Sequence, residues 1–163
     1  MRVVRLGTLL CLTLFAADSL KKPGERQRAP DFELNDAAGS EVRLSAYNGK
    51  VVLLDFWATW CIPCKTQIPW FVEFEQKYKD QGFAVLGISM DKGGWTTVKP
   101  YIERVGINYR IVLGDTRTQY KYGDLDSLPV SFLIDREQRV AAIHIGLASK
   151  KRVEDQIRKL LTE

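Results

Sequence analysis

Two nearly continuous hydrophobic runs dominate the pattern of the chain. VVLLDFWA (residues 51–58) and FAVLGISM (residues 83–90) are each about as long as one strand and have no polar face. Such runs are typical of strands that are buried on both sides, as in parallel sheets covered by helices. Between them, hydrophobic residues recur with helical spacing from Cys61 to about Asp80, which predicts a helix.

The rest of the chain alternates between shorter strand and helix patterns. DFELND and EVRLSA, on either side of residues 37–39, predict a β-hairpin before the first buried run. Beyond the second run the pattern predicts a helix over residues 96–105, a strand over 109–114, a helical stretch over 116–122, a hairpin formed by 131–135 and 139–145, and an amphipathic helix over 149–161. This alternation predicts an α/β fold with a central, mainly parallel mixed sheet and helices on both faces.

The N-terminal segment has the pattern of a secretory signal peptide. Arg2 and Arg5 precede an uncharged apolar run from Leu6 to Ala17, and small residues follow it. We therefore expect residues 1–19 to be a signal peptide or an inner-membrane anchor, residues 20–29 a polar linker, and residues 30–163 one domain. Cys11 would be lost with a cleaved signal, which leaves two cysteines in a periplasmic or otherwise extracytoplasmic compartment.

Composition narrows the choice of partners and ligands. The chain has 163 residues and a formal net charge of +4, with basic residues scattered among acidic ones, so we expect one domain, a monomer and no nucleic-acid partner. One cysteine pair and the single His144 cannot supply the four ligands of a closed zinc site, so we expect no metal and no other cofactor. A copper(I) site formed by Cys61, Cys64 and His144 stays open as an alternative.

The sequence WCIPC places two cysteines where a buried strand gives way to a helix. At a helix N-terminus, unpaired backbone N–H groups and the helix dipole stabilise a thiolate, so Cys61 is the candidate nucleophile. Cys64 lies one helical turn further on, close enough to form a disulfide with Cys61 and to resolve a mixed disulfide. Pro63 suits the first helical turn, where its missing N–H costs no hydrogen bond.

DFWATWCIPC, the proline five residues after its second cysteine, and LPVSFLID resemble the thioredoxin superfamily. The hairpin before the core and the inserted helix and strand between residues 90 and 131 resemble the TlpA/ResA-like branch of exported thiol:disulfide oxidoreductases, with a redoxin or AhpC/TSA-like domain. The resemblance covers about Pro30 to Leu161. It implies a thioredoxin-like fold with an N-terminal β-hairpin and an inserted helix-strand unit.

The same resemblance assigns roles to individual residues. It implies that Cys61 attacks the substrate disulfide and that Cys64 resolves it. It implies a cis Pro129 facing the cysteines, with the backbone of Leu128 presented to an extended substrate. Trp60 and Ile62 would form an apolar rim around the disulfide.

Asp55 interrupts the first buried run and matches an acid that thioredoxins carry there. A carboxyl group buried without a partner has a raised pKa, which suits a general acid–base that exchanges a proton with Cys64. A purely structural, hydrogen-bonded Asp55 is the alternative. Two positions depart from the family pattern: Gln67 stands where ResA-like members commonly have glutamate, and FAVLGISM lacks the lysine that thioredoxins place beside the aspartate.

Three functions follow as hypotheses. The first is a thiol:disulfide oxidoreductase that reduces exported proteins, since Ile62 and Pro63 offer no polar donor to stabilise the thiolate further. The resemblance adds cytochrome c maturation as a task and a membrane electron donor as a partner. The alternatives are a thiol peroxidase of the peroxiredoxin type, although no P-x-x-x-T-x-x-C motif precedes either cysteine, and a non-enzymatic copper(I) module.

Overall fold

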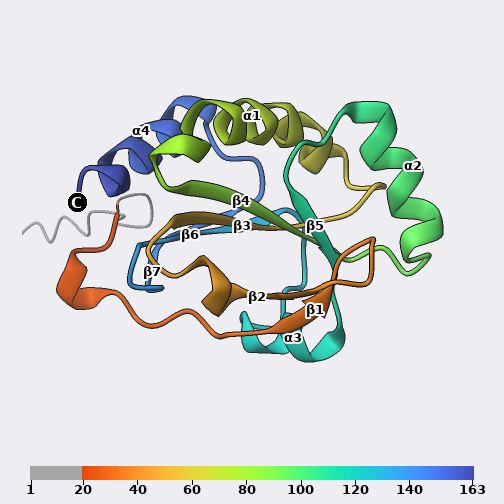
Figure 1. Cartoon of the computed structure of the whole chain (residues 1–163), viewed down its shortest axis with the longest axis horizontal. Coiled ribbons are helices and arrows are strands. Elements are labelled where there is room, and N and C mark those ends of the chain that lie inside the picture. The colour runs from red at the N-terminus through yellow and green to blue at the C-terminus, as the bar shows by residue number, and fades with distance from the viewer. Residues whose placement is uncertain (1–19) are drawn as a thin grey trace, which may run out of the picture.

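The structure is a computed structural model that describes residues 20–163, so the predicted signal peptide or anchor lies outside the described residues. The sheet strands and helices appear in the order that the hydrophobic pattern predicts (Figure 1). The elements are η1 (Pro23–Glu25), β1 (Glu33–Asn35), β2 (Glu41–Arg43), η2 (Leu44–Tyr47), β3 (Val51–Trp57), α1 (Ile62–Tyr78), η3 (Lys79–Gln81), β4 (Phe83–Ser89), α2 (Trp95–Val105), β5 (Arg110–Leu113), α3 (Thr116–Lys121), β6 (Val130–Ile134), β7 (Val140–Ile145) and α4 (Lys150–Leu161).

The central sheet is mixed, as predicted. Its five strands lie in the order β5-β4-β3-β6-β7, and β1 and β2 form a separate antiparallel hairpin. The pairs β3–β4 and β4–β5 are parallel, whereas β3–β6 and β6–β7 are antiparallel. The two continuous hydrophobic runs are therefore neighbours in the middle of the sheet, where both faces are covered.

Two layers cover the sheet. Helices α1, α2 and α4 pack on one face, while the β1–β2 hairpin and α3 lie on the other (Figure 1). Alternate residues of β3 divide between the two cores: Leu53 and Trp57 join the cluster under the three helices, and Leu54 and Phe56 join the cluster under the hairpin. This alternation places the side chain of Asp55 on the α1 side of the sheet.

Residues 20–29 lie along the edge of the domain. The N–H of Lys21 donates to the carbonyl of Ala141 at 2.8 Å, and the N–H of Val140 donates to the carbonyl of Gln27 at 2.8 Å. The segment expected to be a polar linker thus extends the hydrogen bonding of β7 on its open side.

Arg26 fastens this segment to the end of the chain. Its Nη1 lies 3.1 Å from Oδ2 of Asp135 and 2.6 Å from Oε2 of Glu163. The side chains of Arg26 and Asp135 are only 1% and 4% exposed, so this ion pair is buried.

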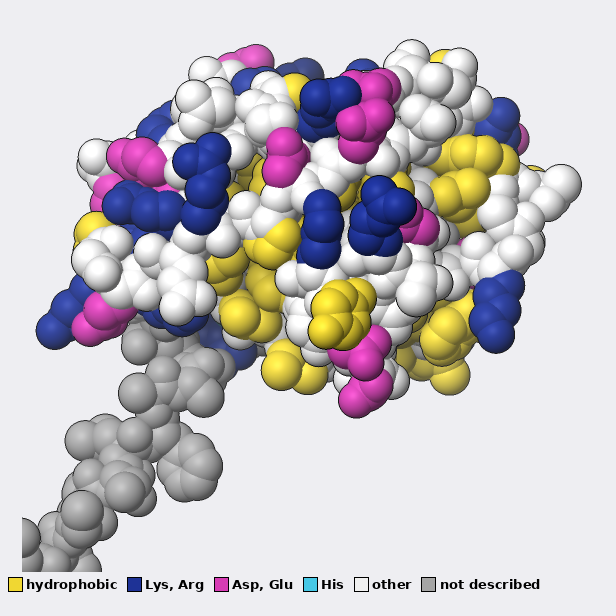
Figure 2. All heavy atoms as spheres, turned by 90° about the horizontal axis from the view of Figure 1, so that it is seen from below, with side chains coloured by type: hydrophobic (Ala, Val, Ile, Leu, Met, Phe, Trp, Pro, Cys, Tyr) yellow, Lys and Arg dark blue, Asp and Glu magenta, His cyan; other side chains and the backbone are white. Residues whose placement is uncertain are grey.

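Charges on the hairpin side of the molecule are mixed. On the face that Figure 2 shows, basic and acidic side chains are interspersed and separate hydrophobic groups lie between them. This face offers no continuous basic stripe of the kind that tracks a nucleic-acid backbone. Within residues 20–163, no helix has the length and apolar character needed to cross a membrane.

Candidate active site

Cys61 and Cys64 form a disulfide at the start of α1. The Sγ atoms are 2.01 Å apart, and the backbone N–H of Cys64 donates to Sγ of Cys61 over 3.2 Å. Cys61 is the N-cap residue of α1, and Pro63 lies in the first turn of the helix. Cys61 keeps 4% of its surface exposed whereas Cys64 has none, so Cys61 is the more exposed of the two cysteines.

Asp91 holds the loop that leads into Cys61. Its Oδ2 accepts from the N–H of Thr59 at 2.9 Å, and its Oδ1 accepts from the Thr59 hydroxyl at 2.6 Å. The hydroxyl of Ser89, at the end of β4, also donates to Oδ2 of Asp91 over 2.8 Å. Sequence reasoning missed this contact, although an acidic residue directly after the buried run FAVLGISM was a usable signal.

Asp55 lies on β3 under α1. It is fully buried, and its Oδ1 has no hydrogen-bond partner among the described residues. Burial raises the pKa of Asp55 from 3.8 to about 8, which confirms the predicted direction. Leu53 and Trp57, its neighbours on the same face of β3, belong with Cys64 to one buried cluster. The carboxyl group therefore enters the same layer as the second cysteine.

Gln67 lies one turn beyond Cys64 on the buried face of α1. Only 1% of its surface is exposed, and neither its amide nitrogen nor its amide oxygen has a hydrogen-bond partner among the described residues. A glutamine can donate and accept hydrogen bonds but does not titrate. Gln67 thus adds a polar group to the buried face of α1 but not a second titratable acid.

The predicted rim residues are exposed. Trp60 and Ile62, on either side of Cys61, are 65% and 76% exposed, which is unusual for large apolar side chains at a well-packed site. The peptide bond between Leu128 and Pro129 is cis, as the resemblance implies.

One pocket brings two of the predicted substrate residues together. It has a volume of about 210 Å³ and lies between Trp60 and Leu128. The other lining residues, which sequence reasoning did not single out, are Met90, Gln119, Leu125, Asp126 and Ser127. Their sequence offered no signal, because the loop before Pro129 approaches Trp60 only in the folded chain.

His144 lies on β7, where it pairs with Ser131 of β6. Burial lowers the pKa of His144, so the ring is neutral at neutral pH. The residues from 20 to 163 contain no group of three or more His, Cys, Asp or Glu side chains that could hold a metal ion. The structure thus does not bring His144 to the cysteines as a third copper ligand.

Comparisons with known proteins agree with this geometry. Residues 26–143 match the AhpC/TSA family. The chain is 36% identical over 132 residues to the thiol-disulfide oxidoreductase ResA of Geobacillus kaustophilus, covering 81% of this chain and 75% of that protein. It is 31% identical over 160 residues to ResA of Bacillus subtilis, covering 93% and 89%.

A solved structure from Chlorobium tepidum, of a protein assigned as the thiol:disulfide interchange protein DsbE, superimposes with a TM-score of 0.78 and 36% identity. The match covers 88% of this chain and 99% of that one. Fold, cysteine pair and relatives all agree: the chain belongs to the AhpC/TSA family and is a ResA-like thiol:disulfide oxidoreductase of the thioredoxin superfamily.

Proposed function

We propose that this protein reduces disulfides in exported proteins, with Cys61 as the attacking cysteine and Cys64 as the resolving cysteine. The observation that carries this assignment is the unequal exposure of the two cysteines at the N-terminus of α1. Cys61 Sγ already accepts the N–H of Cys64, and such a hydrogen bond stabilises a thiolate more than a thiol. Cys64 is enclosed, so a substrate cannot reach it before Cys61 has reacted.

Asp55 supplies the acid–base chemistry in this proposal. The thiol of Cys64 must lose its proton before its sulfur can attack the mixed disulfide, and a buried carboxylate in the same layer can accept that proton. The pKa of Asp55, about 8, lies near the working pH, where a general acid–base is most effective.

Substrate binding is proposed at the rim. Trp60 and Ile62 offer exposed apolar surface on both sides of the disulfide. Leu128 precedes the cis Pro129 and lines the same pocket as Trp60. An extended substrate segment would place in this pocket the side chain that neighbours the substrate cysteine. We assign Trp60, Ile62, Leu128 and Pro129 to substrate binding.

The cellular setting follows from the N-terminal sequence and the relatives. Residues 1–19 carry the signal-peptide pattern, which supports a periplasmic or other extracytoplasmic location with or without an inner-membrane anchor. Disulfide-containing exported proteins are then the substrates, and a membrane protein is the electron donor. Cytochrome c maturation is the task we propose, because the matched proteins include ResA and DsbE.

Trapping in cells tests both the roles and the substrates. A Cys64→Ser variant is expected to accumulate mixed disulfides through Cys61, which can be isolated and identified by mass spectrometry. The matched control is Cys61→Ser, which should trap nothing. If Cys61→Ser traps partners and Cys64→Ser does not, the two roles are reversed.

A further inference from the structure

A row of buried polar side chains crosses the sheet from Asp55 toward α4. Asp55 of β3 pairs with Ser131 of β6, and Ser131 pairs with His144 of β7. Residues paired directly across antiparallel strands carry their side chains on the same face, with Cβ atoms about 5 Å apart. These three residues, which we call the Asp55–His144 row, therefore lie side by side under α1 and α4.

The row is closed to solvent along its length. Asp55, Ser131 and His144 are 1%, 1% and 4% exposed. Neither Oδ1 of Asp55 nor Oγ of Ser131 has a hydrogen-bond partner among the described residues. A buried polar group left unpaired costs about 1–3 kcal/mol, and in proteins such groups are commonly bridged by buried water. The attack and resolution steps alone give no reason for polar residues at positions 131 and 144.

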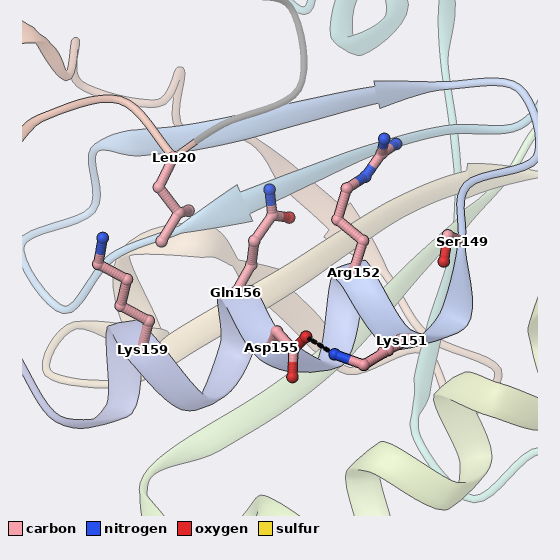
Figure 3. A pocket seen from close by; sticks show the side chains of 7 residues that line it. All are labelled: Leu20, Ser149, Lys151, Arg152, Asp155, Gln156 and Lys159. Carbon is pink, nitrogen blue, oxygen red and sulfur yellow. Dashed lines mark hydrogen bonds and ion pairs between the residues drawn. The ribbon is translucent and has the colours of Figure 1, made fainter.

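The far end of the row lies near a pocket beside α4. The side chain of Gln156, on α4, interacts with His144. Gln156 also lines a pocket of about 390 Å³ beside α4. In Figure 3, Gln156 and Arg152 point from α4 toward the strands, while Lys151 and Asp155 pair with each other along the helix. We expect solvent to occupy this pocket, at the end of the row that is farthest from Asp55.

Asp55 needs such a connection because it is protonated at neutral pH. With a pKa of about 8 in the disulfide form, most molecules hold the proton, and only the carboxylate form can accept another from Cys64. We propose that Ser131 and His144, bridged by buried water, are the route by which Asp55 exchanges its proton with the pocket beside α4. The inference rests on the proposed role of Asp55.

The proton balance of the resolving step is simple. Asp55 first releases its proton along the row and becomes a carboxylate, which then takes the proton of the Cys64 thiol. The Cys64 sulfur attacks Sγ of Cys61, the new intramolecular disulfide forms, and the bond between Cys61 and the substrate breaks. The electron pair leaves with the substrate sulfur, so the substrate disulfide is reduced by two electrons and the enzyme dithiol is oxidised.

Other polar and ionisable groups face the two ends of the row. Around Asp55, β4 presents Gly87, α1 presents Cys64 and Gln67, and Tyr109 interacts electrostatically with the carboxyl group. Burial raises the pKa of Tyr109 well above 10, and Tyr109 in turn interacts with Tyr101 and Glu75.

At the other end, α4 presents Gln156 to His144, and the charged residues that line the adjoining pocket are Lys151, Arg152, Asp155 and Lys159. In the proposed resolving step the proton passes between Cys64 and Asp55.

Single-turnover kinetics test the route. An aromatic disulfide reagent releases one coloured thiolate when Cys61 attacks it and a second when Cys64 resolves the mixed disulfide, so stopped-flow absorbance separates the two steps. Ser131→Ala and His144→Leu should slow the second release about tenfold near pH 7, less than the 10²–10⁴-fold typical of removing a general acid–base itself. The first release should keep its rate.

Two conditions should abolish the difference between these variants and the wild type. Above about pH 9.5 Asp55 is already ionised, so no proton has to leave before resolution. In an Asp55→Asn background the route has no group to serve, so Ser131→Ala should cause no further loss. Thr118→Val, which removes a buried hydroxyl from α3 on the opposite face, is the matched control and should resolve at the wild-type rate.

The outcomes are distinct. Wild-type resolution near pH 7 in folded Ser131→Ala and His144→Leu overturns the route, as does a slow second release that persists at high pH or in the Asp55→Asn background. Ser131→Ala removes only a hydroxyl that has no partner among the described residues, so it keeps the test valid if His144→Leu does not fold. If Asp55→Asn itself resolves normally, the proposed role of Asp55 fails instead.

Discussion

Asp55 of β3 lies beside Gly87 of β4 in the parallel pair at the centre of the sheet. A Cβ atom added at Gly87 would lie 2.5 Å from Cδ1 of Ile111 and 3.0 Å from Nε1 of Trp57, so a larger residue would require these side chains to move. The carboxyl group therefore has no cation beside it on β4, and burial alone sets its raised pKa. The lysine that thioredoxins place beside this aspartate has no counterpart here, because Gly87 occupies the paired position on β4.

Asp55→Asn should slow the resolving step at neutral pH by about 10²-fold or more, because an amide cannot accept the Cys64 proton. The rate of alkylation of Cys61 should change little. The measurement is the second thiolate release described above, recorded between about pH 6 and about pH 10. An unchanged rate and pH profile would rule out proton transfer through Asp55.

Asp55 should also make the disulfide form less stable as the pH rises. The folded protein keeps the proton on Asp55 up to about pH 8, whereas the unfolded chain releases it near 3.8. The contribution of this bound proton to the free energy of unfolding is thus fully present below about pH 4. It is lost as the pH rises through the folded pKa, by up to about 1.4 kcal/mol per pH unit.

Asp55→Asn should remove this dependence, so the variant should gain stability over the wild type toward pH 8. Urea unfolding of both proteins, oxidised, at several pH values measures the difference. A constant difference in the free energy of unfolding between about pH 5 and about pH 8 would contradict the raised pKa.

Arg26→Ala should destabilise the domain by about 1.5–3 kcal/mol, because Asp135 and Glu163 lose a buried charged donor while Asp135 keeps its ion pair with Arg139. Arg43 provides the matched control, since its ion pairs with Glu33 and Glu41 are exposed. Arg43→Ala should cost less than about 1 kcal/mol. Chemical denaturation compares the two, and equal losses would show that residues 20–29 do not contribute to stability through Arg26.

Asp91→Ala should loosen the loop before Cys61 and cost about 2–3 kcal/mol, because Thr59 and Ser89 lose hydrogen bonds to a charged acceptor. Hydrogen–deuterium exchange over residues 57–64 should rise. An exposed acid, Asp80, serves as control, and Asp80→Ala should leave this exchange unchanged. Unchanged exchange in Asp91→Ala would mean that the loop is held by its apolar contacts alone.

The two alternative activities can be measured on the same protein. Peroxide consumption should be slower than insulin disulfide reduction, since neither cysteine follows a P-x-x-x-T-x-x-C motif. Copper(I) binding, if any, should be equal in wild type and His144→Ala, because His144 faces Ser131 and Gln156. Faster peroxide turnover, or copper retention that requires His144, would reverse this ranking.

The hydrophobic pattern predicted most of the fold because the buried runs leave little choice of position. VVLLDFWA and FAVLGISM have no polar face, so they had to occupy the centre of a covered sheet. The cysteines, Pro129 and Asp55 were visible as exceptions within such runs or as parts of a known motif.

The rest depends on contacts between distant parts of the chain. The sequence alone gives Gly87 no special role, and only the register of β3 and β4 places it beside Asp55. The sequence offered His144 only as a candidate copper ligand and gave Ser131 no role, and only strand pairing joins them to Asp55. The polar composition of residues 20–29 gave no sign that Arg26 is buried against Asp135.

The hydrogen bond from the Cys64 N–H to Cys61 Sγ links the backbone at the start of α1 to the redox state of the two cysteines. Sγ of Cys61 caps α1 by accepting this N–H in the disulfide, and the same N–H will face a full negative charge on that sulfur once the bond opens. We expect the reduced form to need little backbone reorganisation, because the helix end is preorganised for the charged sulfur. Electrons and protons are then transferred during turnover with little movement of the backbone around the cysteines.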